Sequence, residues 1–248
     1  MTDDRWIRRF VPSPQAASRL VCLPHAGGSA SYFLPVAKTL APKVEVLAVQ
    51  YPGRQDRRDE PGLESVAELA DGVLGALRPW TGKPLTIFGH SMGASIGFEL
   101  TRRLTDAGMA PTALFASGRR APDRSRDGEH TYLLDDAELA VEVKALGGAG
   151  SHLLDDKDIL QMVLPSIRSD YRAAETYRWT PGPKLKCPVF SFVGDDDPKV
   201  SLDEARAWGE HTEGEFEFRV FAGDHFYIDA HAAEVTAAIA SHIDQAVK

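Results

Sequence analysis

The sequence lacks both of the common glycine patterns that bind nucleotides. Its first glycine-bearing loop, CLPHAGGSASYF at residues 22–33, contains neither G-x-G-x-x-G nor G-K-[ST], which dinucleotide-binding and phosphate-binding loops require. Adjacent glycines after a strand still let the backbone approach a ligand closely and hold negative charge at the next helix N-terminus. This loop is therefore predicted to hold an anionic group, either a phosphate or a developing oxyanion.

Positive charge, long apolar runs and cysteine are also scarce. The 248 residues include 28 Lys and Arg against 36 Asp and Glu, a net charge of -8, which disfavours nucleic acid and anionic membranes as partners. No stretch approaches the roughly 18 apolar residues of a membrane span. The first residues, MTDDRWIRRF, lack the apolar core of an export signal. Cys22 and Cys187 are predicted to be buried thiols, and we expect a cytoplasmic protein.

The apolar residues that are present indicate an α/β protein. With 43% apolar content, residues 1–248 can form a single domain with one full core. Short apolar runs alternate with segments of helical spacing, which is typical of a mostly parallel central sheet flanked by helices. The predicted strands are 20–23, 44–49, 85–88, 113–116, 189–193 and 216–221, with 6–10 as a further edge strand.

Residues 121–183 interrupt this alternation. They contain no good strand but two amphipathic segments, 136–146 and 156–177, the first of which Asp135 or Asp136 could cap. We predict an inserted helical lid between two strands. An ordinary helical crossover that is merely long is the alternative.

The run LTIFGHSMGASIGFEL, residues 85–100, carries the clearest chemical signal. It places Ser91 in a G-x-S-x-G pattern directly after a predicted strand and before a predicted helix. In a nucleophile elbow this context holds the serine in a strained turn, and small residues two positions away let strand and helix pack closely. A tight turn with an incidental serine is the alternative, but the context favours Ser91 as a nucleophile.

A serine nucleophile needs a general base, and the position of His225 fits that role best. Sites in parallel α/β sheets form at the carboxyl ends of strands. His225 follows the strand 216–221, whereas His211 precedes it. His25 and His90 lie at the correct edge but adjoin the loop and the serine too closely to act as base. We expect both to pack or hydrogen-bond locally.

The base in turn needs a carboxylate that orients it. The run FVGDDDPKV offers three at the end of the preceding strand. We expect Asp195 to form the turn and Asp196 to face solvent, which leaves Asp197; Asp123, after an earlier strand, is an outside alternative. The chain order Ser91, Asp197, His225 is the order expected of α/β-hydrolases.

This order gives the first glycine loop a function. The loop would lie beside Ser91 at the same sheet edge, where the backbone N–H groups of Ala26 and Met92 could point at a tetrahedral oxyanion. An oxyanion hole is therefore the preferred interpretation of the loop.

Five motifs together resemble the type II thioesterases of polyketide synthase and nonribosomal peptide synthetase systems, over about residues 20–228. The motifs are PHAGGSASYF, YPGRQDRRDEP, GHSMGA, GDDDPKV and GDHFYI. The resemblance implies an α/β-hydrolase fold with a helical lid and the same roles for Ser91, Asp197, His225, Ala26 and Met92. It also implies hydrolysis of acyl groups from the phosphopantetheine thiol of acyl or peptidyl carrier proteins, which clears stalled or misprimed chains.

Contacts with the substrate and the carrier protein are harder to predict. Arginines follow two strands, Arg54, Arg57 and Arg58 after one and Arg119, Arg120, Arg124 and Arg126 after another. They could form a basic rim for a phosphate or an acidic carrier surface, or simply make solvated pairs with neighbouring carboxylates. The predicted substrate-binding or carrier-binding residues are Phe33, Arg119, Arg120, Leu133 and Leu134.

Two rival functions are also consistent with these residues. The triad alone does not distinguish a thioester from an oxygen ester, so an oxygen-ester hydrolase of the same fold is the first rival. A noncatalytic binding protein on a hydrolase frame is the second. For the thioesterase we expect no metal or redox cofactor, and a monomer.

Overall fold

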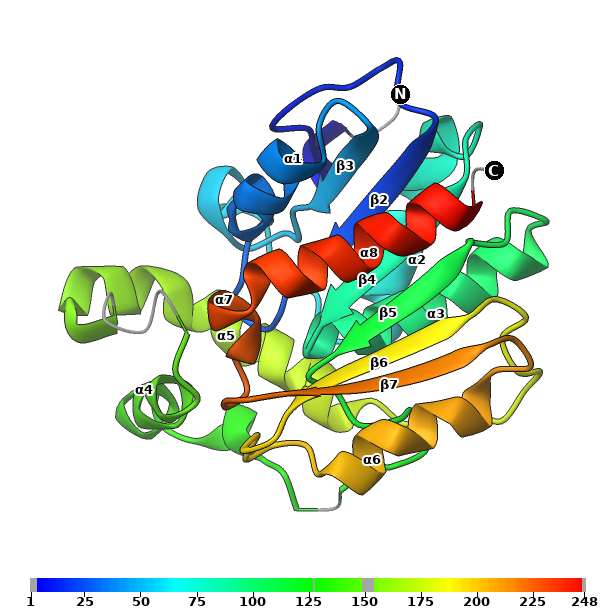
Figure 1. The fold of residues 1–248 in the computed structure, drawn as a ribbon. Coiled ribbons are helices and arrows are strands. Elements are labelled where there is room, and N and C mark those ends of the chain that lie inside the picture. The colour runs from blue at the N-terminus through cyan, green and yellow to red at the C-terminus, as the bar shows by residue number, and fades with distance from the viewer. Residues whose placement is uncertain (1–3, 127, 149–153, 247–248) are drawn as a thin grey trace.

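The computed structural model describes residues 4–126, 128–148 and 154–246. Within these ranges a seven-stranded sheet is flanked by helices (Figure 1). Its strands are β1 (Ile7–Arg8), β2 (Ser18–Leu23), β3 (Val44–Val49), β4 (Leu85–His90), β5 (Ala113–Ser117), β6 (Val189–Gly194) and β7 (Phe216–Phe221). The α-helices are α1 (Leu34–Leu40), α2 (Val66–Leu77), α3 (Met92–Asp106), α4 (Asp136–Ala145), α5 (Lys157–Thr176), α6 (Leu202–Arg206), α7 (Tyr227–Ala230) and α8 (Ala232–Ala246).

The sheet has the order β1-β3-β2-β4-β5-β6-β7, and only β1 runs antiparallel to its neighbour. The chain moves outward from β2 to β3 and then returns past β2 to β4. The register places Leu23 beside Gly89, so the loops after β2 and β4 leave the sheet side by side. A crevice at such a reversal is where open α/β sheets bind ligands.

Helices cover both faces of the sheet, which explains the continuous apolar runs of the central strands. Every residue of β3 and β4 is buried. Helices α1 and α8 pack on one face through one apolar cluster, and α2 and α3 on the other through a second (Figure 1). The edge strand β7 is more exposed.

The predicted strands all form, and the bounds of β3 and β7 are as predicted. The strand predicted at 6–10 is shorter, because β1 pairs with β3 only through Ile7 and Arg8. Cys22 and Cys187 are both buried free thiols, as expected.

Helices α4 and α5 lie between β5 and β6 in the chain and beyond the carboxyl ends of the strands in space (Figure 1). Asp135 caps α4 in a reciprocal capping box with Glu138, which fixes where the helix begins. The described part of residues 121–183 forms no named strand; residues 127 and 149–153 of this segment lie outside the described residues. In the described ranges, none of the helices combines the length and apolarity that crossing a membrane requires.

Candidate functional site

Ser91 occupies the turn between β4 and α3 in a backbone conformation that only a special context supports. Its φ is 54° and its ψ is -119°, a backbone region that residues other than glycine rarely adopt. A Cβ atom at Gly89 would collide with the backbone of Gly93, and one at Gly93 would collide with the carbonyl of Leu23. The glycines on both sides of the serine are therefore required for strand, turn and helix to pack this closely.

The three predicted triad side chains form one hydrogen-bonded series. His225 Nε2 lies 2.9 Å from Ser91 Oγ, and His225 Nδ1 lies 2.9 Å from Asp197 Oδ2. The His225 residue is 4% exposed and the Asp197 carboxylate is fully buried. The other Asp197 oxygen accepts the Lys199 N–H at 2.8 Å. This geometry suits transfer of a proton from the hydroxyl to the imidazole.

The competing carboxylates have other partners. Asp195 Oδ1 accepts the Gly223 N–H at 2.8 Å and so belongs to the turn, while Asp196 is exposed. Asp123 lies 2.7 Å from the buried His211 Nε2. None of the three is hydrogen-bonded to His225 in the described chain.

The two histidines next to the triad stay neutral. His90 Nδ1 is 2.9 Å from Ser117 Oγ, which also bonds Tyr227 Oη at 2.6 Å. Burial, reinforced by the charge of protonated His225, holds the pKa of His90 well below its usual value. Burial and the charges of His225 and Arg54 lower the pKa of His25 to about 3. Neither imidazole therefore places positive charge beside His225 at neutral pH.

The amides of Ala26 and Met92 come from the two loops that leave the sheet side by side. Met92 is the first residue of α3, so its N–H has no acceptor within the helix and lies at the positive end of the helix dipole. Among the described residues, neither amide donates to another backbone carbonyl. Their role as oxyanion donors stays a prediction.

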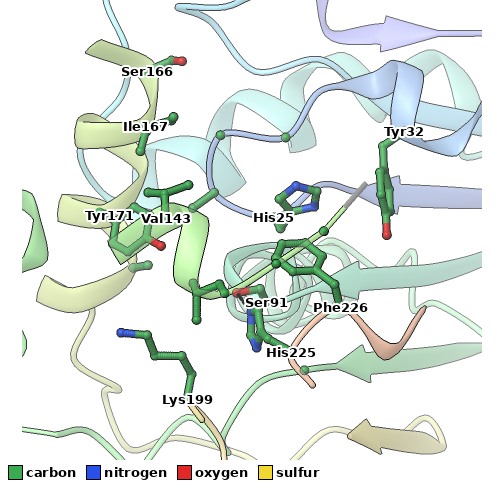
Figure 2. A pocket seen from close by; sticks show the side chains of 18 of the residues that line it. His25, Tyr32, Ser91, Val143, Ser166, Ile167, Tyr171, Lys199, His225 and Phe226 are labelled. Carbon is green, nitrogen blue, oxygen red and sulfur yellow. Dashed lines mark hydrogen bonds between the residues drawn. The ribbon is translucent and has the colours of Figure 1, made fainter. Parts of the chain in front are cut away.

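A cavity of about 510 Å³ opens beside Ser91 and His225 (Figure 2). Its polar lining includes Ser29, Ser31, Gln55 and Lys199. Most of its apolar wall comes from the helical segment between β5 and β6: Val143, Leu146, Leu154, Ile159, Val163 and Ile167. Ser91 thus faces an apolar chamber large enough for an extended acyl group.

Among the described residues, no cluster of three or more His, Cys, Asp or Glu side chains is arranged to bind a metal.

Arg119 and Arg120 line this cavity, but both guanidinium groups are held by protein atoms. Arg119 donates to Ser95 Oγ at 2.9 Å and to the Ala174 carbonyl at 2.8 Å, and Arg120 forms a bidentate pair with Glu129. Their role in binding substrate or carrier stays a prediction, now as part of the cavity wall rather than of an open rim.

Most other arginines of the predicted basic rim are also paired. Arg124 and Arg126 contact Glu210 and Glu204, and Arg57 is buried against Glu60. The solvated-pair alternative therefore describes Arg124 and Arg126 better than a free basic surface does, whereas the pair of Arg57 is buried.

Phe33, Leu133 and Leu134 are not among the described residues that line the cavity. Phe33 is buried against Phe88 in the core, because it ends the turn of 3-10 helix Ala30–Phe33 that packs on the sheet. Leu133 is 67% exposed, and Leu134 packs inside the helical segment. None of these three side chains lies at the site, and their binding role stays a prediction without geometric support.

The structure also brings to the site residues that the sequence analysis gave no role. Phe226 and Tyr32 pack edge-to-face with His25 beside the triad. Asp170 on α5 contacts both Arg54 and the loop that contains Ala26. Helical periodicity places Asp170 on the buried face of an amphipathic helix, where a carboxylate signals a specific partner, but it does not identify that partner.

Comparison with known proteins relates the whole chain to one group of enzymes. The model of the Thioesterase domain family matches residues 18–247. Thioesterase PikA5 of Streptomyces venezuelae is 50% identical over 240 residues, which cover 96% of this chain and 85% of that protein. A probable cadicidin biosynthesis thioesterase of Streptomyces griseus is 45% identical over 247 residues, or 99% of this chain and 68% of that protein.

Solved structures give the same relation. The type II thioesterase BorB from the borrelidin biosynthetic cluster has a TM-score of 0.92 and 50% sequence identity to this chain. The similarity covers 98% of this chain and 99% of that one. It therefore includes the sheet, the elbow and the helical segment that covers the cavity.

Proposed function

The chain belongs to the thioesterase domain family, and from that premise we propose that it hydrolyses acyl thioesters on carrier proteins. Its fold is the predicted α/β-hydrolase fold, with a mostly parallel seven-stranded sheet between helices. The observation that carries the proposal is the hydrogen-bonded series Ser91, His225 and Asp197, which opens onto an apolar cavity.

In the first half of the proposed reaction, His225 Nε2 takes the proton of the Ser91 hydroxyl while Oγ attacks the thioester carbonyl carbon. Asp197 keeps the imidazole in the required tautomer and stabilises the imidazolium. The N–H groups of Ala26 and Met92 stabilise the oxyanion, and loss of one such donor typically costs about 3–4 kcal/mol. The C–S bond then breaks, and His225 returns the proton to the leaving thiol.

In the second half, water attacks the acyl ester on Ser91. His225 takes a proton from that water and passes it to the Ser91 oxygen as the tetrahedral intermediate collapses. The products are a free acid and regenerated enzyme. Every proton moves through His225, so Ser91 and His225 together account for both halves.

A carrier-bound acyl chain is the substrate class that the cavity supports best. The apolar wall offers a long chain about 0.8 kcal/mol for each buried methylene, while the polar side chains of Ser29 and Gln55 that line the cavity suit the amide groups of a phosphopantetheine arm. The named relatives PikA5 and BorB are thioesterases, and BorB comes from a biosynthetic cluster. We infer that this enzyme removes stalled or misprimed chains in a similar assembly line.

The proposal extends to the organisation of the chain. We propose that residues 1–248 form one hydrolase domain and that 121–183 act as its helical lid, since α4 and α5 supply much of the cavity wall. We also propose a cytoplasmic monomer, in keeping with two buried free thiols.

The direct test is mass spectrometry of several acylated carrier proteins incubated with the wild type and with Ser91→Ala. We expect the wild type to remove the acyl mass and to leave the phosphopantetheine arm in place. Ser91→Ala should leave the acyl mass intact, because it lacks the attacking oxygen. Intact acyl groups on every carrier after incubation with the wild type would contradict the proposal.

A matched oxygen ester provides the control for reaction class. The same acyl chain is presented on a carrier thiol and on a simple alcohol, and kcat/KM is compared. Faster hydrolysis of the carrier thioester supports the thioesterase, whereas faster hydrolysis of the oxygen ester would favour the esterase rival.

A further inference from the structure

Arg54 and Asp170 form a buried ion pair between two distant parts of the chain. The contacts are bidentate, with Arg54 Nη1 2.6 Å from Asp170 Oδ2 and Nη2 2.7 Å from Oδ1. Asp170 is completely buried and Arg54 is 6% exposed. Arg54 follows β3, whereas Asp170 lies on α5, within the helical segment that covers the cavity. The pair therefore joins the sheet edge to this segment.

Both members of the pair also hold the loop that contains Ala26. Asp170 Oδ2 accepts the Gly27 N–H at 2.7 Å, and Arg54 Nη1 donates to the Gly28 carbonyl at 3.0 Å. The amide of Gly27 directly follows Ala26 in the chain. Two charge-assisted hydrogen bonds thus fix the backbone immediately after the proposed oxyanion donor.

The conformation of Gly27 strengthens this connection. Its φ is +75°, and a Cβ atom there would lie 2.9 Å from Ile167 Cγ1 on α5. The loop therefore lies directly against the same helix that carries Asp170. On its other side, Gln50 Oε1 accepts the Ala30 N–H at 2.8 Å, so the loop is held at both ends.

Stability alone does not account for this arrangement. Buried ion pairs lose much of their attraction to desolvation, and apolar residues of similar volume often replace them without loss of stability. An apolar pair, however, could not accept the Gly27 N–H or donate to the Gly28 carbonyl. What the ionic pair adds is directional control of the loop backbone.

We propose that Arg54 and Asp170 are positioning residues that hold the Ala26 N–H toward the oxyanion, so that the oxyanion hole is complete only while α5 is docked on the sheet. This inference rests on the proposed function. Misplacement of a catalytic group by about 1 Å can cost roughly 100-fold in rate. The pair acts through the loop and does not itself touch the reacting atoms.

The first test variant is Asp170→Asn, assayed with an octanoyl N-acetylcysteamine thioester. We expect kcat per active site to fall by roughly 10- to 100-fold, with KM changed less than about 3-fold. Active sites are counted by labelling Ser91 to completion with a fluorophosphonate. The rate of that labelling should fall in parallel with kcat, because its transition state also develops negative charge on oxygen.

The double variant Arg54→Met/Asp170→Leu separates positioning from stability. It removes both buried charges, so its unfolding midpoint should recover toward that of the wild type. Leucine offers the Gly27 N–H no acceptor, so kcat per active site should remain low. This variant decides the question even if Asp170→Asn alone fails to fold.

Glu45→Gln is the matched control. Glu45 is 1% exposed and paired with Arg9 and Arg19, and it accepts the Ser13 N–H at 3.4 Å, but it lies near the amino end of β3. The Glu45→Gln substitution should lower the unfolding midpoint without changing kcat per active site.

The inference is overturned if kcat per active site recovers in the double variant, or if Asp170→Asn folds and turns over like the wild type. A wild type that hydrolyses no thioester would instead contradict the proposed function. In that case the rate at which Ser91 is labelled still tests the positioning of the loop.

Discussion

At the residue scale, the chemistry depends on a few atoms whose positions the backbone dictates. The elbow holds Ser91 at positive φ, and in this conformation its Oγ lies 2.9 Å from His225 Nε2. The collisions that a Cβ would cause at Gly89 and Gly93 show why this turn needs glycine on both sides. The side chain of Asp197 is fully buried, and its carboxylate binds both the imidazole and the turn that follows.

Asp197→Asn should lower kcat by roughly 10⁴-fold with little change in KM. The asparagine fits the same space but favours the wrong tautomer of His225 and cannot stabilise the imidazolium. Steady-state kinetics with a soluble thioester measure the effect. Asp196→Asn, an exposed neighbour, is the control and should behave like the wild type; equal losses in both variants would argue against Asp197 as the orienting residue.

At the scale of elements, α4 and α5 give the site its chamber. Two valines on α4 differ sharply in their surroundings, since Val143 lines the cavity and Val141 is 66% exposed. Helix α5 contributes Ile167 to the cavity wall, and its Asp170 accepts the Gly27 N–H in the loop that contains Ala26. One helical segment thus contacts both the cavity and the loop that contains Ala26.

Val143→Asp should lower kcat/KM for an octanoyl carrier thioester by about 10-fold or more, corresponding to about 1.4 kcal/mol, because a carboxylate in the apolar wall must be desolvated when the chain binds. Acetyl thioesters, which are too short to depend on that wall, should be affected much less. Val141→Asp on the same helix should leave both unchanged. A uniform loss for short and long chains would place Val143 outside the acyl pocket.

Local patterns in the sequence predict these elements better than they predict the contacts between them. The strand, elbow and helix around Ser91 follow from consecutive residues, because the G-x-S-x-G turn depends on its own backbone. The capping box at Asp135 is similarly local. Strand order then brings His225 and Asp197 to the same edge as Ser91, which the rule for parallel sheets anticipates.

Contacts between separate elements could not be derived in this way. Phe33 and Leu133 are apolar, but the sequence does not say which way each side chain faces. In the structure Phe33 is buried in the core and Leu133 is exposed to solvent. The partner of Asp170 lies 116 positions away at Arg54. Such pairs depend on how helices dock on the sheet, which spacing along one helix does not specify.

At the scale of the whole molecule, two histidines with lowered pKa values tie the stability of the fold to pH. His90 is fully buried, and its pKa and that of His25 are both lowered, chiefly by burial. In the unfolded chain these groups titrate near pH 6.5. The folded chain resists protonation that the unfolded chain accepts, so this stability is complete above about pH 6.5 and is lost as the pH falls below it.

The free energy of unfolding should therefore fall between pH 6.5 and pH 4 by about 1 kcal/mol per pH unit for each such histidine. Urea unfolding of the wild type and of His90→Asn at several pH values measures this slope. In His90→Asn the free energy of unfolding should depend less steeply on pH, because asparagine does not titrate and about one proton fewer is taken up on unfolding. Parallel slopes would show that His90 does not remain neutral in the fold.

Rapid-quench mass spectrometry of the enzyme during turnover of an acylated carrier protein tests directly whether Ser91 carries the acyl group. We expect a transient acyl mass on the peptide that contains Ser91, formed in the wild type and absent from His225→Ala within the same time. Hydrolysis that proceeds at full rate without acylation of Ser91, or with the acyl group on another residue, would contradict the mechanism.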